Sequence, residues 1–514
     1  MKFERLFEPI SIGKVNIKNR IAMAPMVPGG LVDHDGGFTQ RAIDYYTERA
    51  FGGVGLIISG CTKVSEKVEP RTTLMFVNRR SISSFSELAE SVHYYGTRIF
   101  IQLTAGLGSV IVGSVIDSGF KPVSASAMPA FWRPNVTARA LTTEEVEEIV
   151  DAFGKAAQLL RAAGIDGIEL HGHEGYLFDQ FSTAIWNKRN DKYGGSLEDR
   201  LRFPIEVLNA IKDKAGKDFP VVYRYGLKHY MKGFRTGALP HEDYVEAGRD
   251  VAEGLEMAKL LEKAGFDGLH VDAGSYDSWY WAHPPTYQPH GCMVDMAAEA
   301  KKCVTIPVIT VGRLGIPELA EKVVAEGKAD IVALGRALLA DPHWPRKARE
   351  GKVEEIRPCT GCHDGCLHRE MYQFKPISCA INPATGRERL YTLGVVTQPQ
   401  KVLIAGGGVA GMEAARVAAI RGCEVTLYEK GEKLGGHLIA GSVPDFKRDI
   451  KRLLDWYVIQ LERLGVKIRL QVEVTPELIK KEKPDKIIIA TGSTPIVPSV
   501  PGIEKPIVTN CIDL

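Results

Sequence analysis

The sequence predicts an α/β fold in which a (β/α)8 TIM barrel is followed by a cysteine-bearing loop segment and a Rossmann-like domain. Three observations predict this order. Eight short apolar runs alternate with helix-length segments before residue 346, four cysteines gather between Cys359 and Cys379, and a glycine-rich turn follows a strand near residue 405. At about 150 residues per domain, a chain of 514 residues is long enough for all three parts.

The composition is that of an ordinary globular chain, with 45% hydrophobic and 25% charged residues. Lys and Arg number 65 against 63 Asp and Glu, so the net charge of +2 does not indicate nucleic acid or an anionic membrane as a partner. The N-terminus is too charged for a signal peptide, and no apolar run reaches the about 18 residues that a membrane-spanning helix needs. The sequence therefore predicts a cytoplasmic protein with no nucleic-acid or membrane partner.

The barrel strands are predicted where β-branched residues form short, nearly continuous apolar runs, the pattern of strands buried on both faces. These runs are residues 21–25, 54–58, 98–103, 167–170, 221–225, 268–272, 308–311 and 331–334. The segments between them are helical; residues 143–163, for example, follow a capping sequence and repeat apolar residues at helical spacing. A doubly wound open sheet is the competing fold, but no glycine-rich phosphate turn follows the first strand, which favours the barrel.

The chemistry of such a barrel lies at the carboxyl ends of its strands. The polar residues that fall there are Gln102, His171, Arg224, Asp272, Arg313 and Arg336. The last two belong to matching Gly312-Arg313 and Gly335-Arg336 steps after the seventh and eighth strands. Glycine lets backbone N–H groups approach a phosphate closely, so the two steps together favour a phosphorylated cofactor over two ordinary turns with surface arginines.

The loop segment carries the spacing Cys359-x2-Cys362-x3-Cys366-x12-Cys379. Four thiolates at this spacing favour a [4Fe–4S] cluster. Structural zinc stays an alternative, although it more often uses two Cys-x2-Cys pairs. The run from Cys359 to His363 also matches the attachment pattern of a c-type haem, but that attachment requires export and leaves Cys366 and Cys379 without a role.

The third part begins with a strand from Lys401 and the sequence Gly406-Gly-Gly408-Val-Ala-Gly411, after which we expect a helix over residues 412–421. A second strand ends at Glu429, 23 residues after Gly406. The helix N-terminus would bind a pyrophosphate and Glu429 the ribose hydroxyls, which favours FAD or NAD over NADP. Gly436 in Leu434-Gly-Gly-His437 and a strand over 486–492 are more typical of FAD-binding domains of the disulfide-reductase type.

Three features carry a family resemblance: residues 21–26 (Ile-Ala-Met-Ala-Pro-Met), Gln102, and the long run from Gly172-His-Glu-Gly-Tyr176 through Asn187-x-Arg189-x-Asp191-x-Tyr193 to Arg200. With them the barrel resembles the Old Yellow Enzyme ene-reductases. With the cysteine segment and the FAD domain behind the barrel, the whole chain resembles the 2,4-dienoyl-CoA reductase and 2-enoate reductase branch of these NADH:flavin oxidoreductases.

The resemblance implies FMN in the barrel, with its phosphate on the two Gly-Arg steps and with Pro25, Gln102 and Arg224 along the isoalloxazine. It implies that Tyr176 is the proton donor, a role that suits a phenol whose pKa of about 10 keeps it protonated at neutral pH. The expected activity is that of an NAD(P)H-dependent ene-reductase. Electrons from NADH would pass through FAD and the cluster to FMN, which delivers hydride to the β-carbon of an α,β-unsaturated carboxylate or an enoyl or dienoyl thioester.

The histidine that polarises the substrate carbonyl has three candidates. Ene-reductases present a His–His or His–Asn pair before the Gly-Tyr step, and here the segment reads His171-Gly-His173-Glu174-Gly175-Tyr176. His171 is in register with the first member and Glu174 takes the second position, whereas the enoate-reductase form promotes His173. His283, in the aromatic loop after the sixth strand, is the third candidate.

We expect the FMN-binding barrel over residues 1–345, the iron–sulfur segment and linker over 346–395 and the FAD-binding domain over 396–514. Members of this branch insert a second dinucleotide-binding unit after the Ala490-Thr-Gly strand, and the sequence shows no second Gly-x-Gly-x-x-Gly. The FAD domain is therefore expected to be incomplete and the NAD(P) domain missing. If the chain is complete, an external reductase is the expected electron source.

Two other functions stay open. The same scaffold serves amine dehydrogenases and N-demethylases, although a covalent flavin like that of trimethylamine dehydrogenase is not expected, because no cysteine lies between residue 26 and Cys61. The third interpretation is a truncated flavoprotein that only relays electrons. The sequence is compatible with a homo-oligomer.

Overall fold

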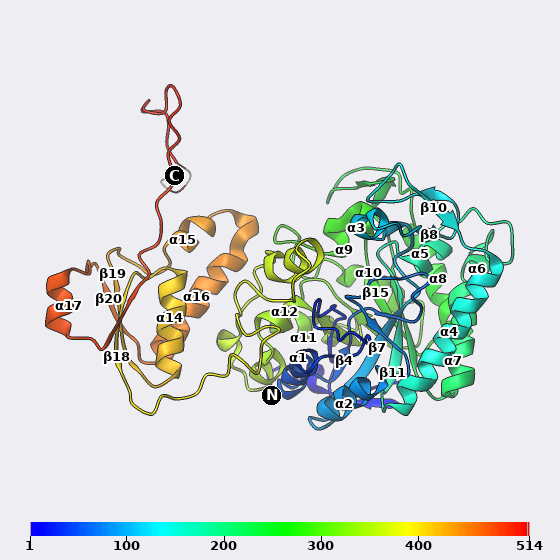
Figure 1. Cartoon of the computed structure of the whole chain (residues 1–514), viewed down its shortest axis with the longest axis horizontal. Coiled ribbons are helices and arrows are strands. Elements are labelled where there is room, and N and C mark those ends of the chain that lie inside the picture. Colours follow the sequence, from blue (N-terminus) through cyan, green and yellow to red (C-terminus); the bar gives the residue numbers. More distant parts are fainter. Residues whose placement is uncertain (1, 511, 513–514) are drawn as a thin grey trace. The chain divides into compact units, whose positions relative to one another are not determined.

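The computed structural model describes residues 2–510 and 512, and the chain divides into two compact units (Figure 1). The first unit comprises the residues up to Lys352 together with Gly361–Leu390. The second comprises Val353–Thr360 and the chain from Tyr391 onward. Each unit has a parallel sheet and a buried core of its own.

The first unit is a closed barrel of eight parallel strands, and the predicted fold class is confirmed. Around the barrel each strand pairs with the next along the chain, and β17 pairs with β3 to close the ring. The strands are β3 (Ile21–Met23), β4 (Leu56–Ile58), β7 (Arg98–Thr104), β11 (Gly167–Gly172), β12 (Val221–Gly226), β15 (Gly268–Asp272), β16 (Val308–Thr310) and β17 (Ile331–Leu334). All eight predicted runs form these strands.

Helices cover the outside of the barrel, as α4 and α7 show side by side in Figure 1. The helices that follow the strands are α1 (Gln40–Phe51), α2 (Ile82–His93), α4 (Thr143–Ala162), α7 (Arg202–Ala215), α8 (Val251–Ala264), α10 (Val294–Lys301), α11 (Pro317–Ala325) and α13 (Trp344–Arg349). Helix α4 begins with the predicted capping box, in which the Thr142 hydroxyl accepts from the Glu145 N–H and the Glu145 carboxylate accepts from the Thr142 N–H. The short helices α5 (Leu177–Ser182), α9 (Trp279–Ala282) and α12 (Arg336–Ala340) lie in the loops after β11, β15 and β17.

The amino-terminal end of the barrel is filled by a hairpin of β1 (Ile10–Ile12) and β2 (Val15–Ile17). Ile12 and Ile17 are fully buried in one cluster with strand residues such as Leu56, Val222 and Ile309. Side chains therefore occupy the barrel interior at this end, which leaves the carboxyl ends of the strands as the place for a ligand.

The second unit is built on a four-stranded parallel sheet in the order β20-β19-β18-β21. The strands are β18 (Lys401–Ala405), β19 (Glu424–Glu429), β20 (Lys467–Leu470) and β21 (Lys486–Ile489), and the helices of at least five residues are α14 (Val409–Ile420), α15 (His437–Gly441), α16 (Arg448–Arg463) and α17 (Pro476–Glu482). Helix α14 packs on the sheet and α16 packs on α14. The predicted helix over 412–421 begins three residues earlier, because Gly408 is its N-cap and accepts a hydrogen bond from the Met412 N–H at 2.9 Å.

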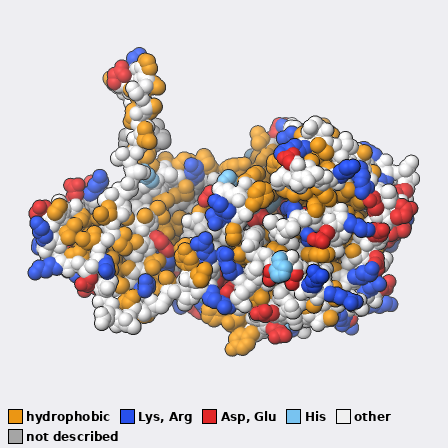
Figure 2. Space-filling model, viewed as in Figure 1, with side chains coloured by type: hydrophobic (Ala, Val, Ile, Leu, Met, Phe, Trp, Pro, Cys, Tyr) orange, Lys and Arg blue, Asp and Glu red, His pale blue; other side chains and the backbone are white. Residues whose placement is uncertain are grey.

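Charged side chains of both signs are interspersed on the face that Figure 2 shows, as the net charge of +2 leads one to expect. Within the described part of the chain, no helix is both long enough and apolar enough to span a membrane.

Candidate active site

A line of buried polar side chains crosses the carboxyl half of the barrel strands. Gln102 on β7 donates through Nε2 to Glu169 on β11 at 2.8 Å, and the second oxygen of Glu169 contacts His270 Nδ1 on β15 at 2.8 Å. All three side chains are essentially inaccessible to solvent. Glu169 holds the Gln102 amide in one orientation and leaves its carbonyl oxygen and second N–H available, so Gln102 fits its predicted role toward a flavin edge.

An ion pair lies nearer to the carboxyl ends of the strands than the Gln102–Glu169–His270 line. The Arg224 guanidinium donates to Asp272 through Nε at 3.1 Å and also through Nη2, and His173 Nε2 lies 3.2 Å from the same carboxylate oxygen. Burial opposes ionisation of Asp272, but the charges of His173 and Arg224 lower its pKa to about 2. Burial lowers the pKa of His173 to about 4, so its imidazole is neutral at physiological pH.

Tyr176 lies directly before α5, with its ring centroid 4.7 Å from that of His171. Its hydroxyl is 3.3 Å from the hydroxyl of Tyr276, which follows β15. Burial, reinforced by the neighbouring Glu174, raises the pKa of Tyr176 well above its ordinary value. Burial and the nearby Arg224 charge lower the pKa of His171 well below the ordinary range. The site therefore combines a protonated phenol with a neutral imidazole.

Glu174 is also a site residue. Its unusual position is visible in the sequence, but no role for it was predicted from the sequence. Its carboxylate lies 3.4 Å from His283 Nε2 and 3.7 Å from His173 Nε2, so it brings two of the candidate histidines together. Burial raises its pKa to about 7, although Arg224 opposes this shift. Glu174 has a φ of +66°, uncommon for a residue with a side chain, so this turn holds a local strain of a kind that clusters at functional sites.

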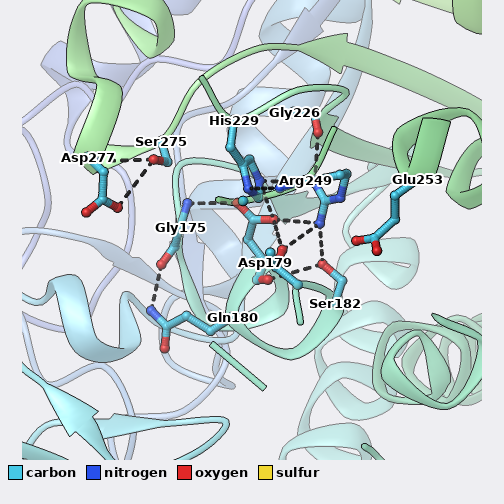
Figure 3. Close-up of polar contacts among 12 residues, drawn as sticks. Gly175, Asp179, Gln180, Ser182, Gly226, His229, Arg249, Glu253, Ser275 and Asp277 are labelled. Carbon is cyan, nitrogen blue, oxygen red and sulfur yellow. Dashed lines mark hydrogen bonds and ion pairs between the residues drawn. The ribbon is translucent and has the colours of Figure 1, made fainter. Parts of the chain in front are cut away.

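A second buried network anchors the turn that carries Tyr176 (Figure 3). Asp179 accepts from the Gly175 N–H at 2.9 Å, and its other oxygen contacts Arg249 Nη2 at 2.9 Å and His229 Nε2 at 3.2 Å. Arg249 also donates to Ser182 and Thr183 in and after α5, and to the Gly226 carbonyl at the end of β12. The network ties α5 to the neighbouring strand, which fixes where Tyr176 leaves the backbone.

Several buried polar atoms at this end of the barrel have no hydrogen-bond partner among the described residues. They include Nδ1 of His171, His173 and His283 and the hydroxyl of Thr310 at the end of β16. His173 Nε2 has no hydrogen bond either, although it lies 3.2 Å from the Asp272 carboxylate. A buried polar group without a partner is unfavourable by about 1–3 kcal/mol, so such atoms indicate a place where a bound molecule completes the bonding.

The two Gly-Arg steps lie where the sequence places them, after β16 and β17. Gly312 has a φ of +107°, which requires glycine, and a side-chain carbon added at Gly335 would come no nearer than 3.4 Å to another atom. The guanidinium of Arg313 donates to the carbonyls of Pro285, Thr286 and Gln288, and that of Arg336 donates to the Pro284 carbonyl at 2.7 Å. Both arginines thus hold the segment after α9. Pro25 is half-buried and lies two residues after the end of β3.

The glycines in the glycine-rich turn of the second unit lie in different surroundings. A Cβ added to Gly406 would lie 2.3 Å from the Ala490 carbonyl oxygen, and one added to Gly411 would lie 1.9 Å from the Gly406 carbonyl oxygen. Both positions must therefore be glycine for the packing. Gly408 meets no atom within 4 Å, and Gly436 lies against it. This is the division of roles in a dinucleotide-binding turn, in which one glycine leaves room for the pyrophosphate. Glu429 accepts hydrogen bonds from the N–H groups of Gly407 at 2.6 Å and Gly431 at 2.7 Å, beside the same turn.

Three of the four clustered cysteines, Cys362, Cys366 and Cys379, belong to the first unit. Cys366 lies in a π-helical segment, Asp364–Tyr372, and the neighbouring Gly365 packs directly against the Cys379 backbone. Among the described residues, no group of three or more His, Cys, Asp or Glu side chains is arranged as a ready metal site.

Comparison with known proteins assigns the family. Residues 5–355 match the NADH:flavin oxidoreductase / NADH oxidase family, and residues 400–513 match the pyridine nucleotide-disulphide oxidoreductases. The chain belongs to the NADH:flavin oxidoreductase / NADH oxidase family. The predicted resemblance is confirmed, and the protein is an oxidoreductase with an FMN-type barrel and an FAD/NADH-type domain.

Two curated relatives and one solved structure of this family are similar over nearly the whole chain. Cinnamate reductase from Clostridium sporogenes is 49% identical over 98% of this chain and 76% of its own length. NADH oxidase from Thermoanaerobacter brockii is 42% identical over 98% of this chain and 75% of its own. The structure of a 2-naphthoyl-CoA reductase complex superposes with a TM-score of 0.91 at 32% identity, covering 99% of this chain and 77% of that one.

Proposed function

We propose that the barrel unit binds FMN and reduces the C=C bond of an α,β-unsaturated carboxylate or enoyl thioester, with NADH as the source of electrons. The observation that carries the proposal is the buried Tyr176 hydroxyl, kept protonated beside neutral histidines at the carboxyl ends of the strands. The similarity to cinnamate reductase supports this substrate class, because cinnamate is an α,β-unsaturated carboxylate.

The residues at the mouth of the barrel fit FMN. The polar atoms of His171, His173 and Thr310 that have no hydrogen-bond partner among the described residues are features that a bound molecule would complete. Gln102, Arg224 and Pro25 would hold the ring system, and the Gly312-Arg313 and Gly335-Arg336 steps the phosphate. When bound, FMN supplies a hydride to the substrate.

Tyr176 would protonate the α-carbon of the substrate. Its raised pKa keeps the proton on the phenol until charge develops on the substrate. A neutral imidazole donates a hydrogen bond to the substrate carbonyl, and this bond strengthens as the oxygen becomes negative, which is where catalysis gains most. His171, beside Tyr176, and His173 and His283, which share Glu174, are the candidates for this donor.

In the second unit, Gly406, Gly408, Gly411 and Gly436 would bind the pyrophosphate of FAD. Glu429 would exchange its contacts to the backbone N–H groups of Gly407 and Gly431 for the ribose hydroxyls. FAD bound here supplies the chemistry for accepting hydride from NADH.

The four cysteines are proposed to hold a [4Fe–4S] cluster. The donor set has the right chemistry, and the close packing of Gly365 on Cys379 supports a shared role for Cys366 and Cys379. Cys359, two residues before Gly361 in the sequence, is included from its spacing alone. Anaerobically purified protein should contain iron and sulfide in equal amounts. Cys366→Ser should lose both, whereas Cys303→Ser, far from the segment in the sequence, should lose neither; zinc without iron would contradict the proposal.

Anaerobic mixing tests the reaction. Chemically reduced protein should be reoxidised by cinnamate, crotonate or a dienoyl-CoA, with a saturated product in each productive case. Oxidised protein mixed with methylamines should stay oxidised. Flavin bleaching by a methylamine without any reaction with an unsaturated acid or thioester would instead identify an amine dehydrogenase or demethylase, and reactivity with neither class would leave only electron relay.

A further inference from the structure

Arg71 is a cation beside the proposed site that the reaction as described above does not use. It follows β5 (Thr62–Lys63), and its side chain is 18% exposed. Nε and Nη2 donate to the buried carboxylate of Glu69 at 2.8 and 3.4 Å, and the backbone carbonyl of Arg71 accepts from Lys63 Nζ at 2.8 Å. Among the described residues, Nη1 donates to no acceptor. The guanidinium is therefore fixed on one edge and has a donor available on the other.

Arg71 and Tyr176 are attached to the same short segment. The Glu69 carboxylate that holds Arg71 accepts from the Leu107 N–H at 3.3 Å, and the Leu177 N–H, next to Tyr176, donates to the Gly106 carbonyl at 3.1 Å. The charge of Arg71 acts on the hydroxyls of both Tyr176 and Tyr276. Arg71 therefore lies on the side of the site from which the proton is delivered.

The surroundings of the two tyrosines are apolar and aromatic. Tyr176 and Tyr276 belong to one buried cluster with Phe131, against which the half-buried Trp132 and Trp279 pack. The ring centroids of Tyr276 and Trp279 are 4.7 Å apart, and those of Tyr276 and Phe131 are 5.6 Å apart. Such a cluster suits the aryl group of a substrate, but it offers no partner for a charged group on that substrate. Arg71 can supply that partner.

We propose that Arg71 binds the carboxylate of an arylacrylate-type free acid and so makes the free acid, and not its thioester, the preferred substrate. This inference rests on the proposed function. Hydride addition to the β-carbon breaks the C=C π bond, and its electron pair moves to the α-carbon and is delocalised onto the oxygens bonded to C1. The proton from Tyr176 then forms the new C–H bond at the α-carbon, and the phenolate left behind takes up a proton from solvent. In a free acid these oxygens already carry the carboxylate charge, so a second negative charge develops on them. A thioester or aldehyde starts neutral and gains only one, which is why a fixed guanidinium matters most for the acid.

Glu370 is the second acid on which the Arg71 charge acts. Burial raises the pKa of Glu370 to about 7, although Arg71 opposes this shift, so near neutral pH a large fraction of this side chain is uncharged. The positive charge of Arg71 is then balanced by Glu69 alone, and the partnerless Nη1 is left for a substrate oxygen.

The test compares Arg71→Gln with wild-type holoenzyme on cinnamate and on cinnamaldehyde, the neutral analogue of the same shape. The ratio of kcat/KM for the acid to that for the aldehyde should fall by about 100-fold, the effect of losing a charge-assisted hydrogen bond. The dissociation constant of 3-phenylpropanoate, measured by calorimetry, should rise by a similar factor. Arg71→Lys, which keeps the charge, should recover part of both losses, and Arg79→Gln, at an exposed arginine, should change neither.

Equal losses on acid and aldehyde, or an unchanged ratio, would overturn the proposal, because Arg71 would then act only on the fold or not at all. Flavin content and thermal unfolding of each variant show whether it has folded. If wild-type protein reduces neither of these compounds nor crotonate nor a dienoyl-CoA, the proposed function is wrong, and the 3-phenylpropanoate measurement alone decides whether Arg71 binds a carboxylate.

Discussion

Two buried polar clusters lie next to each other in the barrel unit, and they differ in how completely their atoms are paired. In the Asp179–His229–Arg249 network, each charged group has a partner of opposite charge, and Arg249 Nε is its only nitrogen or oxygen atom without a hydrogen bond among the described residues (Figure 3). In the cluster of His171, His173 and Glu174, Nδ1 of both histidines has no hydrogen-bond partner among the described residues, and His173 Nε2 has only an ion-pair contact, 3.2 Å from Asp272.

The difference separates a cluster that holds the fold from one that is ready for a ligand. A buried network in which nearly every polar atom is paired rigidifies the structure and gains little from a further partner. Buried polar atoms without a partner are unfavourable, and a bound flavin or substrate would remove that penalty. The two clusters are close in the chain: six residues lie between His173 and Gln180, whose Nε2 donates to the Gly175 carbonyl at 2.6 Å.

The largest effect is expected from Asp179→Asn. This substitution leaves Arg249 buried with no carboxylate partner in the network, and an uncompensated buried charge destabilises a protein by about 3–5 kcal/mol. Thermal unfolding should therefore occur at a clearly lower temperature. Asp218→Asn breaks an exposed ion pair with Arg161 and serves as the matched control, in which little change is expected. Equal stability of the two variants would show that the network does not hold the fold.

Tyr176→Phe should have the opposite pattern, a large loss of activity with little loss of stability. Removal of a general acid slows turnover by about a hundredfold or more. FMN content should stay at the wild-type level. Tyr225→Phe is the control, because the Tyr225 hydroxyl donates to Gly254 in α8, on the outside of the barrel, and its loss should leave turnover intact. Wild-type ene reduction by Tyr176→Phe would remove Tyr176 from the mechanism.

The fold and part of the site could be predicted from the sequence because their signals are local. Each barrel strand is a run of a few apolar residues, and the roles of Gly406, Gly408 and Gly411 follow from one short motif. Tyr176 was found because it belongs to a long run of family-specific residues.

The contacts that complete the site join residues far apart in the chain, and no local sequence pattern predicts such contacts. Asp179 and Arg249 are 70 residues apart, and Arg249 lies in a loop before α8 with no periodic signal. Arg71 was missed for the same reason, because its relation to Tyr176 runs through Glu69 and Leu107. Glu174 was noted as a departure from the family pattern, but only the folded turn shows that it lies between His173 and His283.

Glu174→Gln should alter the pH dependence of stability. The folded pKa of Glu174 is raised from 4.5 to about 7, so the stability that its protonated form contributes is fully present below pH 4.5 and is lost as pH rises toward 7. The loss amounts to about 3 kcal/mol at most. A glutamine cannot ionise, so the unfolding temperature of the variant relative to wild type should increase between pH 5 and pH 7 and stay constant above. A difference between the two proteins that does not vary with pH would contradict a buried, uncharged Glu174.

The smallest effect is expected from Tyr276→Phe, which tests whether the Tyr276 hydroxyl acts on the reaction only through Tyr176. The two hydroxyls are 3.3 Å apart, and a neutral hydrogen bond contributes about 0.5–1.5 kcal/mol, so turnover should fall by no more than about tenfold. If Tyr276 acts by orienting the Tyr176 hydroxyl, its removal should have no further effect in a Tyr176→Phe background, because the interaction it serves is already gone. Additive losses in the double variant would show that Tyr276 contacts the substrate independently. Both phenols would then be candidates for the proton donor.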